Sequence, residues 1–290
     1  MAVEYQAVAK YLANPKRFVH ETAAHAAYTV GEFVGKHHKY QVVIREPGQL
    51  PIEMALATQE AIQHFHPQLA LQIGVAGGIK DVTIGDVLIA DKVYSYEGGK
   101  EDKDGFKARP VMGGGSRELL AYAQIMSKSD EWKSRTGDGA LHSRIFFGAI
   151  ASGSKVIANS NSPTYQNIKK HFNDSLGVEM EAYGFVLALH GVHGLVIRGI
   201  SDLCEGKAEA SDEHWQPVAV ERAAAVGFEM LYQLNCNSLP NLDLSAKISK
   251  NITPEIKMSS NNQIQGSTIT VGGNFRQGDT VVYRYPEPDK

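Results

Sequence analysis

Hydrophobic positions along residues 3–235 follow two periods, one typical of helices and one typical of strands. Apolar residues of 3–12 fall near one helical face, so the chain is expected to enter a helix almost at once, with no strand before it. Strands are predicted at 39–46, 68–79, 86–97, 145–157, 177–182 and 194–202. Helices are predicted at 52–65, at 116–128 with Ser116 as N-cap, directly after residue 182, and at about 215–234. This alternation predicts an α/β domain of three layers, in which helices cover both faces of a mainly parallel or mixed sheet.

The pattern changes after residue 236. Residues 237–262 are rich in Asn, Ser and Lys and predict a polar linker. Residues 263–290 alternate apolar and polar side chains around several glycines, which predicts short strands and turns. Because so small a β unit is marginally stable by itself, we expect it to pair with another copy, another chain or the main domain. The sequence therefore divides into a large domain (1–236), a linker (237–262) and a β-rich tail (263–290).

Composition narrows the possible partners. With 29 basic and 32 acidic side chains, the formal charge of -3 provides no overall field for capturing nucleic acid or a membrane surface. The two cysteines, Cys204 and Cys236, cannot form a disulfide framework and lack zinc-site spacing. No stretch near the start resembles a secretory leader, and no run has the roughly 20 apolar residues that cross a bilayer. We expect a cytoplasmic protein without a metal or cofactor.

Small and polar residues collect where the predicted strands stop, at 74–78, 152–154, 179–181 and 201–202. In open α/β sheets, ligands bind outside the carboxyl ends of the strands, so these clusters are expected to meet in space. Asp202 ends the last strand, where burial can raise the pKa of a carboxyl group toward the range that a general acid needs. The same aspartate could instead cap the following turn.

Glu179 and Glu181 are two residues apart on an extended segment, so they are expected to project to one side and Met180 to the other. A carboxylate there can accept two hydrogen bonds from a vicinal diol such as a ribose, and a methionine can cover the apolar sugar face. One of the pair could instead bond to backbone or to an arginine such as Arg198. This structural role is favoured for Glu179.

Two further features are ambiguous by themselves. The loop at 74–78, GVAGG, allows a ligand close to the backbone, but glycines after a buried strand also form simple turns. It lacks both the GxGxxG fingerprint and the GKS/T of a P-loop, which disfavours a Rossmann dehydrogenase or a P-loop NTPase. Glu4 lies in a first helical turn, where the helix dipole favours glutamate whatever its function.

Five motifs together resemble one family in their order and spacing: VEYQAV, GVAGGIKDVTIGDVLIADKV, GAIASGSKVI, VEMEAYGF and VIRGISD. The family is the purine nucleoside phosphorylase and uridine phosphorylase superfamily, and the nearest branch is its methylthioadenosine/S-adenosylhomocysteine nucleosidases. The resemblance covers roughly residues 3–235. It implies the nucleoside phosphorylase-like α/β fold, cleavage of a bond between base and ribose, and a homo-oligomer.

By this resemblance, Asp202 would protonate N7 of the leaving purine and Ser201 would help to orient it. Glu181 would hold the ribose 2' and 3' hydroxyls, Met180 would pack on the sugar, and Glu4 would activate the water.

The walls of the pocket follow from the same resemblance. Val156 and Ile157 would line the base pocket, and the loop residues Val75, Ala76 and Gly77 would lie beside the water or phosphate.

This chain departs from the family pattern in several places. The family's opening strand, which normally precedes the Glu4 motif, is missing, so the sheet is expected to lose a strand or obtain one from elsewhere. Val75 replaces a polar residue of many nucleosidases, and Val156 replaces an aromatic one that is common in the family. The tail after 237 has no counterpart in the housekeeping enzyme.

The segments YEGGK (96–100), RGISD and WQPVAVERAAA resemble nucleosidase-like effector domains of bacterial NLR-type immune proteins. That resemblance implies a purine nucleotide such as ATP as substrate. Hydrolysis of a purine nucleoside or nucleotide is the leading hypothesis, and self-assembly through the tail could gate it. Phosphorolysis is the first alternative, and an inactive nucleotide-binding assembly module is the second.

Overall fold

The computed structural model describes residues 2–19, 26–46, 48, 50–205, 209–235 and 280–285. Its helices are α1 (Ala2–Ala9), α2 (Pro51–Phe65), α3 (Arg117–Met126), η1 (Glu131–Arg135, a 3-10 helix), α4 (Pro163–His171), α5 (Ala182–Ala188) and α6 (Glu209–Gln233). The first strands are β1 (Ala13–Val19), β2 (Ala27–Val34), β3 (Lys39–Arg45), β4 (Leu69–Gly78), β5 (Val87–Ser95), β6 (Gly99–Asp102) and β7 (Gly105–Ala108). The others are β8 (Val111–Gly113), β9 (Ile145–Ser152), β10 (Ser175–Glu179), β11 (His193–Asp202) and β12 (Thr280–Tyr285).

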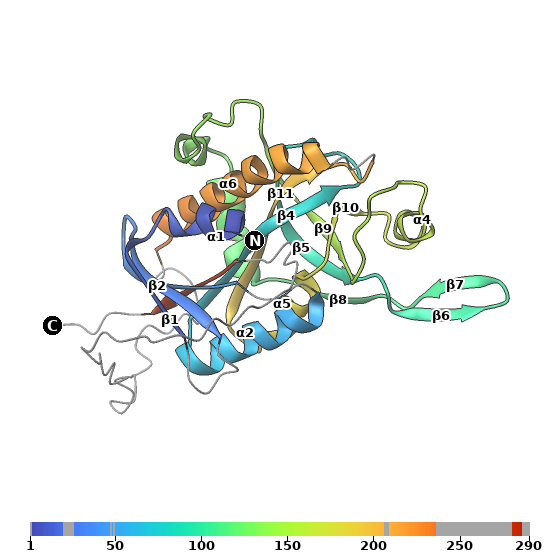
Figure 1. The fold of residues 1–290 in the computed structure, drawn as a ribbon, viewed down its shortest axis with the longest axis horizontal. Coiled ribbons are helices and arrows are strands. Elements are labelled where there is room, and N and C mark those ends of the chain that lie inside the picture. The colour runs from blue at the N-terminus through green and yellow to red at the C-terminus, as the bar shows by residue number, and fades with distance from the viewer. Residues whose placement is uncertain are drawn as a thin grey trace, which may run out of the picture.

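One mixed sheet organises the fold (Figure 1), with strands in the order β1-β2-β3-β12-β4-β10-β9-β5-β11. β11 also pairs with β4, so the five strands from β4 to β11 close into a ring. Within the ring, β4 is parallel to β11 and β9 is parallel to β10 and β5. The contacts of β10 with β4 and of β11 with β5 are antiparallel. β4 and β11 therefore run in one direction, and β9 and β10 run in the other. The carboxyl ends of the two pairs meet where Gly177 and Val178 of β10 pair with Gly78 and Gly77 of β4.

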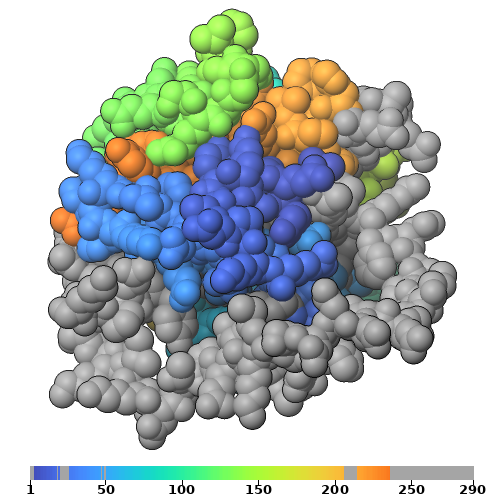
Figure 2. Space-filling view, turned by 60° about the vertical axis from the view of Figure 1, so that its left-hand side comes forward, coloured from blue at the N-terminus to red at the C-terminus, as the bar shows by residue number. Residues whose placement is uncertain are grey.

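Helices cover both faces of the sheet, as the alternating pattern predicts (Figure 1). Buried residues of α1, α3 and α6 form one hydrophobic cluster with one face, and those of α2 and α5 form a second cluster with the other. α6 approaches β11 closely because Gly199 has no side chain: a Cβ there would lie 1.9 Å from the carbonyl oxygen of Ala219. Figure 2 shows the blue N-terminal segments on the surface beside the green segment around η1 and orange α6.

The predicted elements agree with the structure within a few residues over most of the chain. Ser116 caps α3 as predicted, and its Oγ accepts a hydrogen bond from the Leu119 amide at 3.4 Å. The β1–β2 hairpin and α4 were not predicted. The last helix was predicted from about residue 215, six residues after Glu209, where α6 begins. The exposed polar side chains of β1 hide its strand character, since neither of its faces forms a continuous apolar row.

The tail contributes a strand to the main sheet. β12 lies between β3 and β4 and is antiparallel to both. Of the three partners expected for the tail, the structure pairs this segment with the main domain. Because the family's opening strand is missing, the sheet was expected to lose a strand or to obtain one from elsewhere. β12 of the tail is a strand obtained in this way. The predicted linker at 237–262 and the tail residues 263–279 and 286–290 lie outside the described residues. Among helices in the described ranges, none combines the length and hydropathy that crossing a bilayer requires.

Candidate active site

A cavity lies at the carboxyl ends of β4, β10 and β11, where the strand-end clusters were expected to meet. The ladders bring these ends together: Gly77 pairs with Asp202, and Glu179 pairs with Ser152. An irregularity in the β4–β11 register between Ile200 and Asp202 turns the end of β11 at this point. The cavity is lined by Val75, Ala76, Gly77, Lys155, Val156, Ile157, Val178, Glu179, Met180, Ser201, Asp202 and Cys204.

All predicted site residues except Glu4 and Glu181 belong to this lining. Glu4, which lies in α1, is 2% exposed, and Glu181, which follows Met180 in the sequence, is 5% exposed. Glu179 and Met180 both belong to the cavity lining, whereas Glu181, to which the resemblance assigns ribose binding, does not.

Asp202 caps the turn after β11, and it also lines the cavity. Its Oδ1 accepts the Cys204 amide at 2.8 Å, which caps the following turn, and its Oδ2 accepts the Ser201 hydroxyl at 3.2 Å. The side chain nevertheless lines the cavity and is only 7% exposed. Held by these two donors, the carboxyl group has a fixed direction at the edge of the cavity. A fixed direction is one of the requirements of a general acid.

The glutamate pair is anchored by Arg198, whose side chain is fully buried. Arg198 Nη2 donates to Glu179 Oε2 and lies 3.6 Å from Glu181 Oε2. Glu179 Oε2 also accepts the amides of Glu181 at 2.9 Å and Ala182 at 2.8 Å, so it holds the first turn of α5. The structural role favoured for Glu179, bonding to backbone and to Arg198, is present in the structure.

Several lining or supporting residues were missed by the sequence analysis. Lys155 lies in the motif GAIASGSKVI, Val178 lies in VEMEAYGF, and Cys204 is two residues after Asp202. Their position next to predicted site residues was the signal that could have identified them. Tyr96 supports the loop after β9: its hydroxyl accepts the Lys155 amide at 3.3 Å, and its ring fills the space where a Cβ on Gly153 would lie. Burial raises the pKa of the Tyr96 phenol well above its usual range, so it remains a neutral packing group.

The cavity is narrow. Its volume of about 40 Å³ has room for only a few water molecules, whereas ligand pockets commonly span about 300–1,000 Å³. A purine nucleoside can enter only if part of the lining moves outward. The segment Lys155–Ile157 belongs to neither a helix nor a strand, and Val156 is 57% exposed. Because Lys155 and Val156 are exposed, an outward movement of this loop would break few side-chain contacts there.

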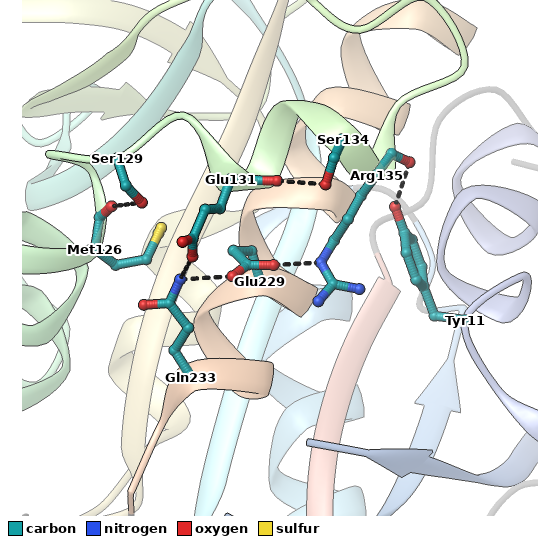
Figure 3. Close-up of polar contacts among 8 residues, drawn as sticks. All are labelled: Tyr11, Met126, Ser129, Glu131, Ser134, Arg135, Glu229 and Gln233. Carbon is teal, nitrogen blue, oxygen red and sulfur yellow. Dashed lines mark hydrogen bonds and ion pairs between the residues drawn. The ribbon is translucent and has the colours of Figure 1, made fainter. Parts of the chain in front are cut away.

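A second cavity, of about 940 Å³, lies beside the last turns of α6. Its polar groups bind one another (Figure 3): Glu229 accepts Arg135 Nε at 2.5 Å, and Gln233 Nε2 donates to both Glu229 and Glu131 at 2.6 Å. The Tyr11 hydroxyl donates to the Arg135 carbonyl at 3.2 Å. These contacts connect η1 to α6 and to the turn that follows α1. Since no predicted site residue lines this cavity, the first cavity is the candidate active site.

Comparison with known proteins identifies the family. Residues 1–231 match the family profile described as "Phosphorylase superfamily". The chain belongs to this superfamily. Among phosphorylase superfamily structures, the methylthioadenosine/S-adenosylhomocysteine nucleosidase of Neisseria meningitidis, solved with methylthio-immucillin-A, superposes with a TM-score of 0.66 at 22% identity. That match covers 81% of this chain and 96% of the nucleosidase and shows the shared fold.

Two curated relatives carry names of nucleosidases. The 5'-methylthioadenosine/S-adenosylhomocysteine nucleosidase of Haemophilus influenzae (strain PittEE) is 29% identical over 214 residues, covering 70% of this chain and 86% of the relative. A "Death domain-containing ATP nucleosidase" of the sponge Amphimedon queenslandica is 25% identical over 216 residues. This second match covers 66% of the chain and 40% of the sponge protein. Each relative is therefore similar to about two thirds of this chain.

Proposed function

We propose that the protein hydrolyses the N-glycosidic bond of a purine nucleoside or nucleotide and releases the free base. The observation that carries this proposal is the convergence of Asp202 with the Glu179–Met180 segment on one apolar-walled cavity at the strand ends. Once the lining has moved outward, a flat base would lie against Val156, Ile157 and the other apolar lining residues, and an acid beside it can protonate its ring nitrogen. The nucleosidase names of the relatives support the same reaction.

In the proposed mechanism, Asp202 donates its proton to N7 of the purine as the bond between C1' and N9 breaks. The bonding electrons pass into the base, which leaves as a neutral molecule, and the ribose develops oxocarbenium character. Water then attacks C1', and Glu4 accepts the proton that the water loses. Glu181 holds the ribose hydroxyls while Met180 covers the sugar. The assignments of Glu4 and Glu181 rest on the family resemblance and require both carboxylates to gain access to the bound substrate.

Hydrolysis is favoured over phosphorolysis by the charge of the cavity. Among the residues that line it, Lys155 is the one cation, and Val75 adds no polar side chain to the glycine loop. A phosphate nucleophile needs several cationic or amide donors to bind before it attacks. Adding inorganic phosphate to the reaction tests this preference, because ribose 1-phosphate as product would establish phosphorolysis instead.

The substrate is proposed to be a nucleotide such as ATP, and the biological role to be an immune effector that depletes the nucleotide pool. The name of the sponge relative, an ATP nucleosidase with a death domain, supports this choice. The decisive experiment incubates the purified full chain with adenine and guanine nucleosides and nucleotides, and follows free base by chromatography. Release of adenine from ATP is the expected result. If no base appears at any protein concentration or assembly state, the chain is a binding module.

Gly77→Ala is expected to lower base release sharply, measured beside a thermal melt of the same sample. A Cβ at this position would lie 2.7 Å from Cys204 Sγ and 2.9 Å from Asp202 Oδ1, so the carboxyl group must shift. Misplacing a catalytic group by about 1 Å can reduce the rate about 100-fold. The matched control is Gly137→Ala, whose Cβ would approach nothing closer than 3.9 Å. Equal base release from both variants would contradict the assignment of Asp202.

A further inference from the structure

The position of β12 in the sheet has consequences beyond the reaction. Val281 pairs with Arg45 on β3 and with Gln72 on β4, and Tyr283 pairs with Val43 on β3 and with Ala70 on β4. Within the part of the chain that the structure describes, β3 and β4 do not pair with each other. β12 is therefore the link through which the β1–β3 strands join the ring in the hydrogen-bonded sheet.

An empty place between β3 and β4 would be unfavourable. Residues 42–44 of β3 and 69–73 of β4 are each no more than 2% exposed. Without β12, backbone groups on both facing edges would lose their hydrogen-bond partners in this buried layer, and a buried backbone group without a partner is strongly unfavourable. Alternatively, the β1–β3 strands would move away and expose apolar surface, which is also unfavourable.

We propose that the slot between β3 and β4 is a strand-binding site whose occupant is the chain's own residues 280–285. The slot takes an extended hexapeptide segment antiparallel to both neighbours, and the sheet of the nucleosidase-like domain is complete only when that segment is seated. β4 connects the slot to the candidate active site. Its residues 70–73 border the slot, and Val75, Ala76 and Gly77 of the same strand line the cavity. The tail is thus an integral strand of the catalytic domain.

The chain is long enough to place this segment. Residues 236–279 separate the last described residue of the α6 region from Thr280. A stretch of this length spans at most about 145–160 Å when fully extended. It can therefore reach the slot of its own domain, and it could also reach the slot of a second copy. The test must separate these two occupants.

Disulfide trapping in the full chain provides that test without relying on activity. Val282 lies directly opposite Ile44, and the Cα spacing of about 4.5–5.5 Å between such neighbours suits a disulfide. In a Cys236→Ser background, Ile44→Cys with Val282→Cys is expected to link within one chain on mild oxidation. The control pair, Gln41→Cys with Val282→Cys, is out of register by three residues and should not link. No link in the first pair, or a link between two chains, would overturn the proposal.

A proline scan keeps the proposal testable if the cysteine pair perturbs folding. Val282→Pro removes an amide from an interior strand, which is expected to lower the melting temperature by roughly 6–12 °C. Ser259→Pro, in the segment before β12, is the matched control and should leave the melting temperature unchanged. Base release should fall with Val282→Pro under the proposed function. Equal melting temperatures for both proline variants would overturn the strand assignment, whereas an inactive wild type with a trapped strand would overturn only the proposed function.

Discussion

Asp202→Asn is expected to abolish release of free purine base while the protein stays folded. Asparagine can still accept the Cys204 amide and so preserve the turn, but it has no acidic proton for the leaving base. General acid catalysis contributes about 10²–10⁴-fold to such reactions, and the loss should lie in that range. The measurement is kcat/KM for base release beside a thermal melt of the same sample.

Two controls make this prediction specific. Asp104→Asn changes an exposed carboxylate in the β6–β7 hairpin and should leave the rate unchanged. A p-nitrophenyl riboside has a leaving group that departs without protonation, so Asp202→Asn should affect its cleavage far less than cleavage of a purine nucleoside. If the variant loses activity equally on both substrates, Asp202 positions the site and does not donate the proton.

Arg198→Met is expected to cause the largest loss of stability. Arg198 is fully buried, donates to Glu179 and lies 3.6 Å from Glu181, so its removal leaves two buried carboxylates without this cation. Breaking a buried ion pair by removing one partner costs about 3–5 kcal/mol. For a domain of this size, that corresponds to a fall in melting temperature of roughly 6–20 °C. Urea unfolding followed by circular dichroism measures the free energy directly.

The matched control is Arg109→Met, which removes an exposed arginine and should change the free energy of unfolding by no more than about 0.5 kcal/mol. The double variant Arg198→Met with Glu179→Gln should recover part of the loss, because one of the two buried negative charges is then gone. The side-chain oxygen of the glutamine can still accept the hydrogen bonds from the Glu181 and Ala182 amides. A loss below about 1 kcal/mol for Arg198→Met would show that these carboxylates are stabilised by other groups.

The α/β class and most element positions could be predicted because they depend on local periodicity. The apolar runs that become β4 and β11, the amphipathic pattern of α2 and the capping serine at Ser116 are each encoded within a short stretch. The meeting of the strand ends was expected from the rule for parallel sheets, but the structure achieves it differently: β4 and β10 are antiparallel and pair at their carboxyl-terminal residues. By contrast, β1 has no regular apolar face, so no local pattern predicts it as a strand.

The sequence by itself determined which residues could form the site: an acid at the end of β11, a pair of glutamates after β10 and a glycine-rich end of β4. The tertiary structure decided that Glu179 is among the residues that line the cavity while Glu181 and Glu4 are not, and that Cys204 forms part of its wall. It also decided that residues 280–285 complete the sheet. The physical reason is that a strand's neighbours and a side chain's surroundings depend on backbone edges and buried charges contributed by residues distant in the chain, which no local pattern records.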